Sequence, residues 1–274
     1  MKIGLIGGTG FYDLFDSLEE IEIETDYGKI TLFKSHYAGN EIYFLPRHGT
    51  GHGVLAPDVN YKGNIMALKK TGVNQIIAVS AVGSINREIP VGGLSLLNQF
   101  VDFTRRRSTS YGQFSADITD PFCPKLQETI KQAAGQIEQK IYEDTTLICV
   151  DGPIYETRNE LQVFASWGMD VVGMTNSTEA VLTRELGMCF SVVTLSTDIA
   201  TGTSDVPPDL ATHKRVAESN KHKVKQLILK TLENFTGETE CKCGQSFNKA
   251  NLSYKFIGRG VLSEDRNHWR NRLL

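Results

Sequence analysis

The sequence has no long apolar run, little net charge and few cysteines, and each shortage excludes a class of protein. None of its apolar stretches reaches the ~18 residues that a membrane-spanning helix needs. The net charge is −3, from 29 basic and 32 acidic side chains, so no nucleic-acid partner is expected. The N-terminal apolar stretch is short and runs into a glycine turn, unlike a signal peptide. We therefore expect a cytoplasmic protein without a membrane partner.

The five cysteines do not form a recognisable metal-binding pattern. Cys149 and Cys189 lie in apolar runs, where buried thiols are common, and Cys123 lies singly. Cys241 and Cys243 form a CxC pair that is open to a redox or metal role. Because no second pair completes a set of four ligands, we interpret these two as thiols of a polar tail and predict no metal ion.

Composition and patterning predict an α/β fold. Hydrophobic residues make up 40% and charged residues 22% of the chain, which is typical of globular proteins. Short β-rich runs alternate with helical patterns, which favours a mixed, mostly parallel β-sheet flanked by helices. Strands are predicted over 2–6, 21–24, 30–33, 41–45, 75–79, 146–150, 169–172 and 189–195, with a further apolar run over 94–103. Helices are predicted over 60–71, 124–140, 158–167, 177–186 and 210–235.

One domain is predicted over residues 1–236, with a C-terminal extension of unknown role over 237–274. No internal repeat and no linker divides the first part of the chain. The extension is polar and shows little periodicity, so it does not read as a second folded unit.

Polar and small residues gather where the predicted strands end. In α/β sheets, ligands bind at the carboxyl ends of the strands. Six such groups at strand ends therefore indicate a binding site more strongly than any one of them does. They occur at 7–10, 47–52, 80–84, 152–156 and 174–175, and at Asp198.

Taken singly, these groups allow plain structural explanations. The glycines at 7–10 suit an anion site or a tight turn, and they lack the G-x-G-x-x-G pattern of a dinucleotide site. Arg47 offers a guanidinium fork that suits phosphate, or is a surface arginine, and His48 can simply pack the loop. The i, i+4 spacing of His48 and His52 would suit a metal only on a helix, which the surrounding glycines oppose. Asp198 could keep a proton for a leaving group in a dry pocket, although a turn or N-cap aspartate explains its spacing more simply.

Seven sequence segments, which follow one another along the chain, carry a resemblance to a known family. The resemblance extends from Lys2 to about Phe235. They are IGLIGGTGFYD, LPRHGTGH followed by VNYKGNI, AVSAVGSI, DPFCP, DGPIYETRNE and SWGMDVVGMTNSTEAVLTRELGMCFSVVTLSTD. The chain resembles the trimeric purine nucleoside phosphorylases, in their 5′-methylthioadenosine phosphorylase branch. That resemblance implies phosphorolysis of a purine nucleoside to free base and a ribose 1-phosphate, in a homotrimer, with no metal and no organic cofactor. The segment 113–122 matches the region that reaches the neighbouring subunit.

The resemblance also implies roles for individual residues. Met174 would lie against the ribose, Tyr155 would pack on the base, and Asp198 would face N7 of the purine as the catalytic residue. The phosphate ligands would be Thr9, Arg47, His48, Ser80, Ala81 and Thr175.

Four positions depart from the pattern of the methylthioadenosine branch. Asp198 lacks the second aspartate of a D-x-D pair, and Glu156 matches a glutamate of the branches that take 6-oxopurines. His213 resembles the histidine that meets a 5′-hydroxyl, and Ile154 replaces an arginine. We expect 5′-methylthioadenosine as substrate. The alternatives are a 6-oxopurine nucleoside (methylthioinosine, inosine or guanosine) and a nucleoside-binding protein without activity.

Overall fold

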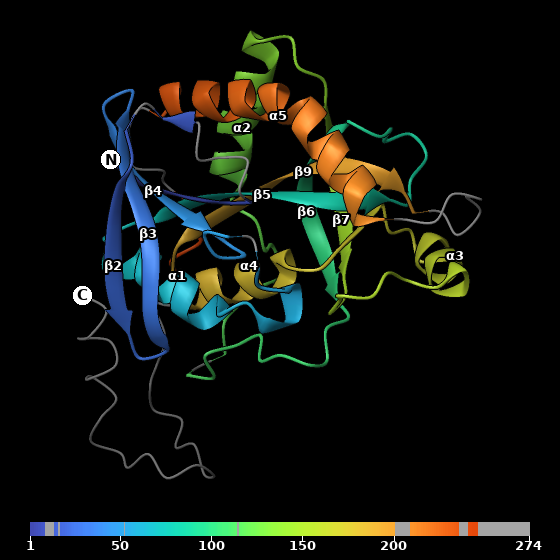
Figure 1. Ribbon diagram of the computed structural model, residues 1–274, viewed down its shortest axis with the longest axis horizontal. Helices are drawn as coiled ribbons and strands as arrows, with labels where there is room; N and C mark the ends of the chain where they lie inside the picture. Colours follow the sequence, from blue (N-terminus) through green and yellow to red (C-terminus); the bar gives the residue numbers. More distant parts are fainter. Residues whose placement is uncertain are drawn as a thin grey trace.

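Nine strands in the described part of the chain form one sheet, around which the helices pack (Figure 1). The structure, a computed structural model, describes residues 1–8, 14–15, 17–51, 53–113, 115–200, 209–235 and 241–245. The strands run in the order β2-β3-β4-β1-β5-β8-β7-β6-β9, and β5 also pairs with β9. Their bounds are β1 Lys2–Gly7, β2 Glu19–Thr25, β3 Gly28–Tyr37, β4 Asn40–Pro46, β5 Gln75–Ser84, β6 Leu94–Asp102, β7 Ile141–Cys149, β8 Val171–Gly173 and β9 Cys189–Ile199.

The sheet mixes parallel and antiparallel pairs, and the predicted α/β fold class is confirmed. Parallel pairs join β1 to β4 and β5, β5 to β9, and β7 to β6 and β8. Antiparallel pairs join β3 to β2 and β4, β5 to β8, and β6 to β9. Because β9 pairs with both β5 and β6, the strands β5, β8, β7, β6 and β9 form a closed ring. Ring closure leaves these five strands without an unpaired edge.

Helices cover both faces of the sheet (Figure 1). Helices α1 (Tyr61–Lys70) and α4 (Asn176–Glu185) pack together over an apolar core on one face. Helices α2 (Pro124–Gln136) and α5 (Leu210–Glu233) pack together over a second core on the other face. The shorter α3 (Arg158–Ser166) packs its Leu161 and Phe164 into a third, smaller core near the ends of β5 and β7. None of the helices in the described ranges is both long and apolar enough to cross a bilayer.

Several strands run further than the sequence predicts, and two of them, β5 and β9, carry predicted site residues. The strand predicted to end at residue 79 continues to Ser84, and the one predicted to end at 195 continues to Ile199. Small residues such as Ser80 and Gly83 have low strand propensity, but pairing of β5 with β9 and β8 overrides it. As a result Ser80 and Asp198 lie within strands, not in loops that follow them.

Helix α2 is shorter than predicted. It ends at Gln136, not at 140, and Glu138 just beyond it adopts a positive φ of 53°. A residue in the left-handed region cannot continue a right-handed helix, so the chain turns there into β7.

Candidate active site

Arg47 leaves the end of β4 and enters the protein interior, where it is 4% exposed. Its Nε and Nη2 donate to the two carboxylate oxygens of Glu179 on α4, at 2.5 and 3.0 Å. Its Nη1 donates to the carbonyl of Val79 on β5 at 3.0 Å. Burial works against the guanidinium charge, but Glu179 beside it raises the pKa of Arg47 above its ordinary value. Three of its five N–H donors thus meet protein acceptors in the described chain, and the other two can bind an anion.

The contacts of Arg47 bring other predicted phosphate ligands to the same place. Val79 precedes Ser80, whose buried Oγ meets no hydrogen-bond partner among the described residues. Glu179 lies one helical turn after Thr175, the N-cap residue of α4, and its backbone N–H donates to the Thr175 carbonyl at 3.4 Å. A helix N-terminus favours bound anions. The ends of β4 and β8 and the middle of β5 therefore meet around an arginine, a hydroxyl and a helix start.

His48 and Ala81 border this group. The Nδ1 of His48 lies 2.8 Å from the Val54 carbonyl; because a carbonyl only accepts, Nδ1 carries the proton. Ala81 is exposed in the middle of β5, although its strand neighbours are buried, so the sheet is open to solvent at this point. Thr9 and His52 lie outside the described residues.

A second polar group lies further along β5 and β9. The β5–β9 register shifts between Val82 and Gly83, and this irregularity sets Asp198 opposite Gly83. A Cβ on Gly83 would come within 3.2 Å of Asp198 Oδ2, so the glycine leaves room for the carboxylate. Bulges of this kind commonly re-aim side chains beside binding sites.

Asp198, His213 and Tyr155 lie in a chain of short contacts. The Nε2 of His213 lies 3.1 Å from Asp198 Oδ1, within ion-pair distance. The Nδ1 of His213 lies 3.1 Å from the Tyr155 hydroxyl, and the two rings meet edge to face with centroids 5.2 Å apart. The His213 side chain is 16% exposed, so it is largely buried against these partners. It sits in the first turn of α5, which Asp209 caps by accepting from the Thr212 N–H at 2.8 Å.

Glu156 lies close to this group, and the pKa of its carboxyl is raised. Burial, together with the nearby charge of Asp198, raises the pKa of Glu156 to about 7. Near neutral pH its carboxyl is therefore present in both forms and can donate as well as accept. The neighbouring Ile154 is 71% exposed, and its apolar side chain adds no polar contact.

Arg107 and Glu179 are site residues that sequence reasoning missed. The Nη2 of Arg107 donates to the Met174 carbonyl at 2.6 Å, and its Nη1 to the Tyr61 hydroxyl at 2.9 Å. Its Nε is buried without a hydrogen-bond partner among the described residues. Arg107 belongs to a run of three arginines in a loop, which gave no signal. Glu179 lies four residues after Thr175 on one helix face, a spacing that links it to a predicted ligand but does not show its contact with Arg47.

Met174 lies beside the turn that precedes Tyr155 and Glu156. A Cβ on Gly152 would come within 2.4 Å of the Met174 Sδ, so this side chain packs directly on the glycine backbone. Gly152 precedes the segment of Tyr155 and Glu156 and has a φ of 68°. Met174 thus links Thr175, the next residue in the chain, to the segment that contains Tyr155 and Glu156.

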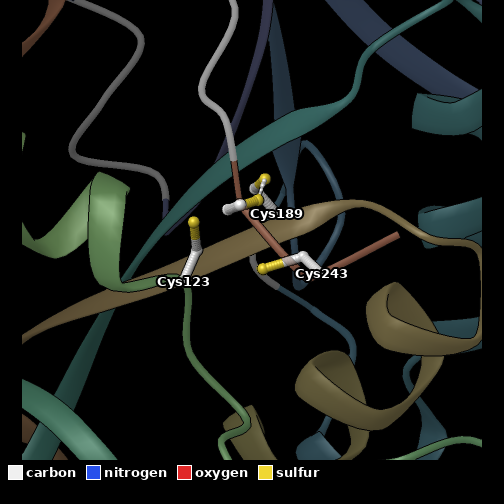
Figure 2. Close-up of side chains that lie close together, drawn as sticks. Cys123, Cys189 and Cys243 are labelled. Carbon is white, nitrogen blue, oxygen red and sulfur yellow. Dashed lines mark hydrogen bonds between the residues drawn. The ribbon is translucent and has the colours of Figure 1, made fainter. Parts of the chain in front are cut away.

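Four cysteines gather away from these residues, and Figure 2 shows three of them meeting from separate segments. Their sulfur atoms all lie within 4.8 Å of one another. The interpretation of the CxC pair as isolated tail thiols is therefore wrong, because two distant cysteines complete the set of four. Folding joins residues that the sequence separates by more than fifty positions. We call this group the cysteine cluster; it consists of Cys123, Cys189, Cys241 and Cys243.

Comparison with known proteins gives one family. The family model described as the phosphorylase superfamily matches residues 2–233. A probable 6-oxopurine nucleoside phosphorylase of Dictyoglomus turgidum is 39% identical over 254 residues, covering 89% of this chain and 95% of the relative. An S-methyl-5′-thioadenosine phosphorylase of Nitrosopumilus maritimus is 34% identical over 261 residues, covering 91% and 98%.

Solved structures are similar over most of the chain. A methylthioadenosine phosphorylase of Schistosoma mansoni in complex with adenine has a TM-score of 0.85 and 26% sequence identity. The match covers 92% of this chain and 98% of that one. A methylthioadenosine phosphorylase from an antarctic soil metagenomic library has a TM-score of 0.78 and 29% identity, covering 84% of each chain.

Proposed function

Because the chain belongs to the phosphorylase superfamily, we propose that it cleaves the N-glycosidic bond of a purine nucleoside with inorganic phosphate. The products are the free base and a ribose 1-phosphate. The observation that carries this proposal is the placement of an anion-binding group and a carboxylate on one pair of strands. Ser80 pairs with Thr194, and Gly83 pairs with Asp198. Three residues along β5 span about 10 Å, which leaves space for a ribose between phosphate and purine.

In this proposal, phosphate binds beside Arg47 and Ser80 at the start of α4. His48, Ala81, Thr175 and Thr9 complete the phosphate ligands. Cleavage builds positive charge on the sugar, and the phosphate held below the ring stabilises that charge. Arg107 is a positioning residue, since its contact with the Met174 carbonyl holds the residue placed against the ribose.

The departing purine gathers negative charge, which a proton at N7 neutralises. Asp198 is placed to provide that proton, and Nε2 of His213 lies 3.1 Å from its Oδ1. Tyr155 lies on the other side of His213 and offers its ring to the base. Asp198 is thus the proposed catalytic residue, and Tyr155, Glu156, Met174 and His213 contact the nucleoside.

We take 5′-methylthioadenosine as the first candidate substrate. Asp198 supports it, because the 6-oxopurine branches usually carry asparagine at that position. The relative of Nitrosopumilus maritimus and the adenine complex of Schistosoma mansoni lend further support. The products would then be adenine and 5-methylthioribose 1-phosphate.

A 6-oxopurine nucleoside is the second candidate, and two observations favour it. Glu156 can accept from the protonated N1 of such a base, and its pKa of about 7 keeps a large anionic fraction at neutral pH. His213 adds a polar group where the methylthio branch prefers an apolar one. The relative of Dictyoglomus turgidum supports this candidate.

The test is release of free base, followed by chromatography, with and without phosphate. The substrates are methylthioadenosine, methylthioinosine, adenosine and inosine. Phosphate-dependent adenine release from methylthioadenosine supports the first candidate, and turnover of the 6-oxopurine substrates alone supports the second. Binding of nucleoside without phosphate-dependent release of any base would contradict both and favour an inactive binding protein.

Three further expectations are part of the proposal. The chain assembles as a homotrimer, acts in purine salvage and resides in the cytoplasm. A domain boundary near residue 237 also stays a prediction; the family match ends at residue 233.

A further inference from the structure

We propose that the cysteine cluster binds one zinc ion through its four thiolates and so fixes the 241–245 segment to the core. This site is separate from the proposed active site. Cys189 begins β9 and Asp198 lies near its end, nine residues further on, so the two are about 30 Å apart. The inference therefore does not depend on the proposed function.

The separations between the sulfur atoms suit a tetrahedral site. Zinc–sulfur bonds of about 2.3 Å place the sulfurs of a tetrahedral tetrathiolate site about 3.8 Å apart. In the cluster all sulfurs lie within 4.8 Å of one another, and those of Cys189 and Cys241 lie 3.3 Å apart. Shifts of about 1 Å would thus suffice to coordinate an ion.

Two of the ligands are held by the folded core. Cys123 directly precedes α2, and its backbone N–H donates to the Phe190 carbonyl on β9 at 2.8 Å. Cys189 donates from its own N–H to the Asn74 carbonyl at 2.8 Å. These backbone bonds position half of the site before any metal binds, as structural sites require.

The other two ligands come from a turn. Successive residues of an extended chain point to opposite sides and residues i and i+2 to the same side, so the CxC spacing allows both cysteines to face one ion. Here the N–H of Gln245 donates to the Lys242 carbonyl at 3.0 Å, and the chain turns at Cys243. The turn brings both sulfurs to the side of Cys123 and Cys189, although the pair is spaced more closely than in most zinc sites.

A helix N-terminus and an arginine lie beside the cluster. The backbone N–H groups of Lys125 and Leu126, at the start of α2, hydrogen-bond to Cys123. Arg184, whose guanidinium donates to the carbonyls of Asp120 and Pro121, lies near Cys243. Arg184 and the positive end of α2 offset the negative charge of a tetrathiolate zinc site.

Burial makes the site structural rather than catalytic. Cys123 is 0% and Cys243 2% exposed, and Leu126 packs against them. Four protein ligands in such a setting leave no position for water or substrate. Zinc binding transfers the thiol protons to the buffer and needs no oxidant, whereas disulfides would need an acceptor for two electrons per bond. All five cysteines keep their thiols in the structure.

The first test measures metal content in the full chain, purified under reducing conditions with zinc chloride present. We expect one zinc per chain by plasma emission spectroscopy. Cys243→Ser, and separately Cys123→Ser, should weaken zinc binding by about tenfold or more, since each removes a ligand. Cys149→Ser removes a thiol outside the cluster and should retain the zinc. Equal zinc content in Cys243→Ser and wild type would overturn the proposal.

A second test uses the wild type alone, in case the variants do not fold. Cobalt(II) added to the chelator-treated protein should give the intense visible bands of tetrahedral tetrathiolate cobalt, and zinc should abolish them. Absence of these bands would overturn the proposal. So would an intact mass, measured without reductant, that shows disulfides between cluster cysteines in the freshly isolated protein.

Discussion

Asp198 is the residue whose substitution separates chemistry from binding most cleanly. Its proposed task, protonation of N7, arises only as the bond breaks, so removal of the carboxyl should lower kcat more than it raises KM. We expect Asp198→Ala to lower kcat by about 10²-fold or more. Steady-state base release under saturating phosphate measures this effect.

Asp198→Asn is the matched variant, because its amide keeps an N–H donor of similar size. It should retain more activity than Asp198→Ala, above all with inosine and methylthioinosine. Near-normal kcat in Asp198→Ala would contradict the leaving-group role.

Glu156 should make the stability of the protein depend on pH. The folded state holds its proton up to a pH of about 7, whereas the unfolded chain loses it near the ordinary carboxyl pKa of ~4.3. Between these values the folded state binds more protons, so a rise in pH lowers the free energy of unfolding. The slope is at most about 1.4 kcal/mol per pH unit.

Glu156→Gln cannot ionise and should remove this contribution. Urea unfolding at several pH values between about 5 and about 7 should show wild type losing stability relative to the variant as pH rises. Parallel curves for the two proteins would mean that the Glu156 pKa is not raised.

At the scale of elements, the Arg47–Glu179 pair ties the end of β4 to α4 across the phosphate side of the site. Both side chains are almost fully buried. Removal of one partner leaves the other as an uncompensated buried charge, which typically costs about 3–5 kcal/mol. We therefore expect Arg47→Met alone to lower the free energy of unfolding by about that amount.

The double variant Arg47→Met with Glu179→Met separates stability from function. Replacement of a buried ion pair by apolar side chains of similar size is often neutral, so it should recover most of the lost stability. It should not recover activity, since the proposed phosphate ligand is gone, and KM for phosphate should stay raised. Chemical unfolding and phosphate titration of both variants provide the measurement. A stable double variant with normal KM for phosphate would contradict the role of Arg47.

At the scale of the whole molecule, sequence patterning predicts the structural features that are local in the chain or that follow from the topology of the sheet. The alternation of strands and helices gives the fold class, and the polar residues that follow β4 and β8 do lie close together, beside the middle of β5. Contacts between distant segments could not be foreseen in this way. Glu179 reaches Arg47 over 132 positions, and Asp198 reaches His213 only because α5 folds back on the sheet.

The cysteine cluster illustrates the same limit. Cys123 and Cys189 carry no spacing pattern with the CxC pair, because several helices and strands separate the four cysteines along the chain. The backbone hydrogen bond from Cys123, at the start of α2, to Phe190 on β9 holds them near each other. Spacing rules for metal sites detect ligands within one segment, and two ligands here come from separate segments of the core.

The oligomeric state of the protein can also be tested. The resemblance implies a trimer in which a neighbour completes the sugar pocket, and Ala81 is open to solvent in the single chain. If a neighbour closes this opening, dissociation should abolish activity, because water exclusion strengthens the electrostatic stabilisation of the transition state. Light scattering should give three times the chain mass, and activity per chain should fall on dilution as the mass falls. A monomer whose specific activity is unchanged by dilution would show that one chain forms the complete site.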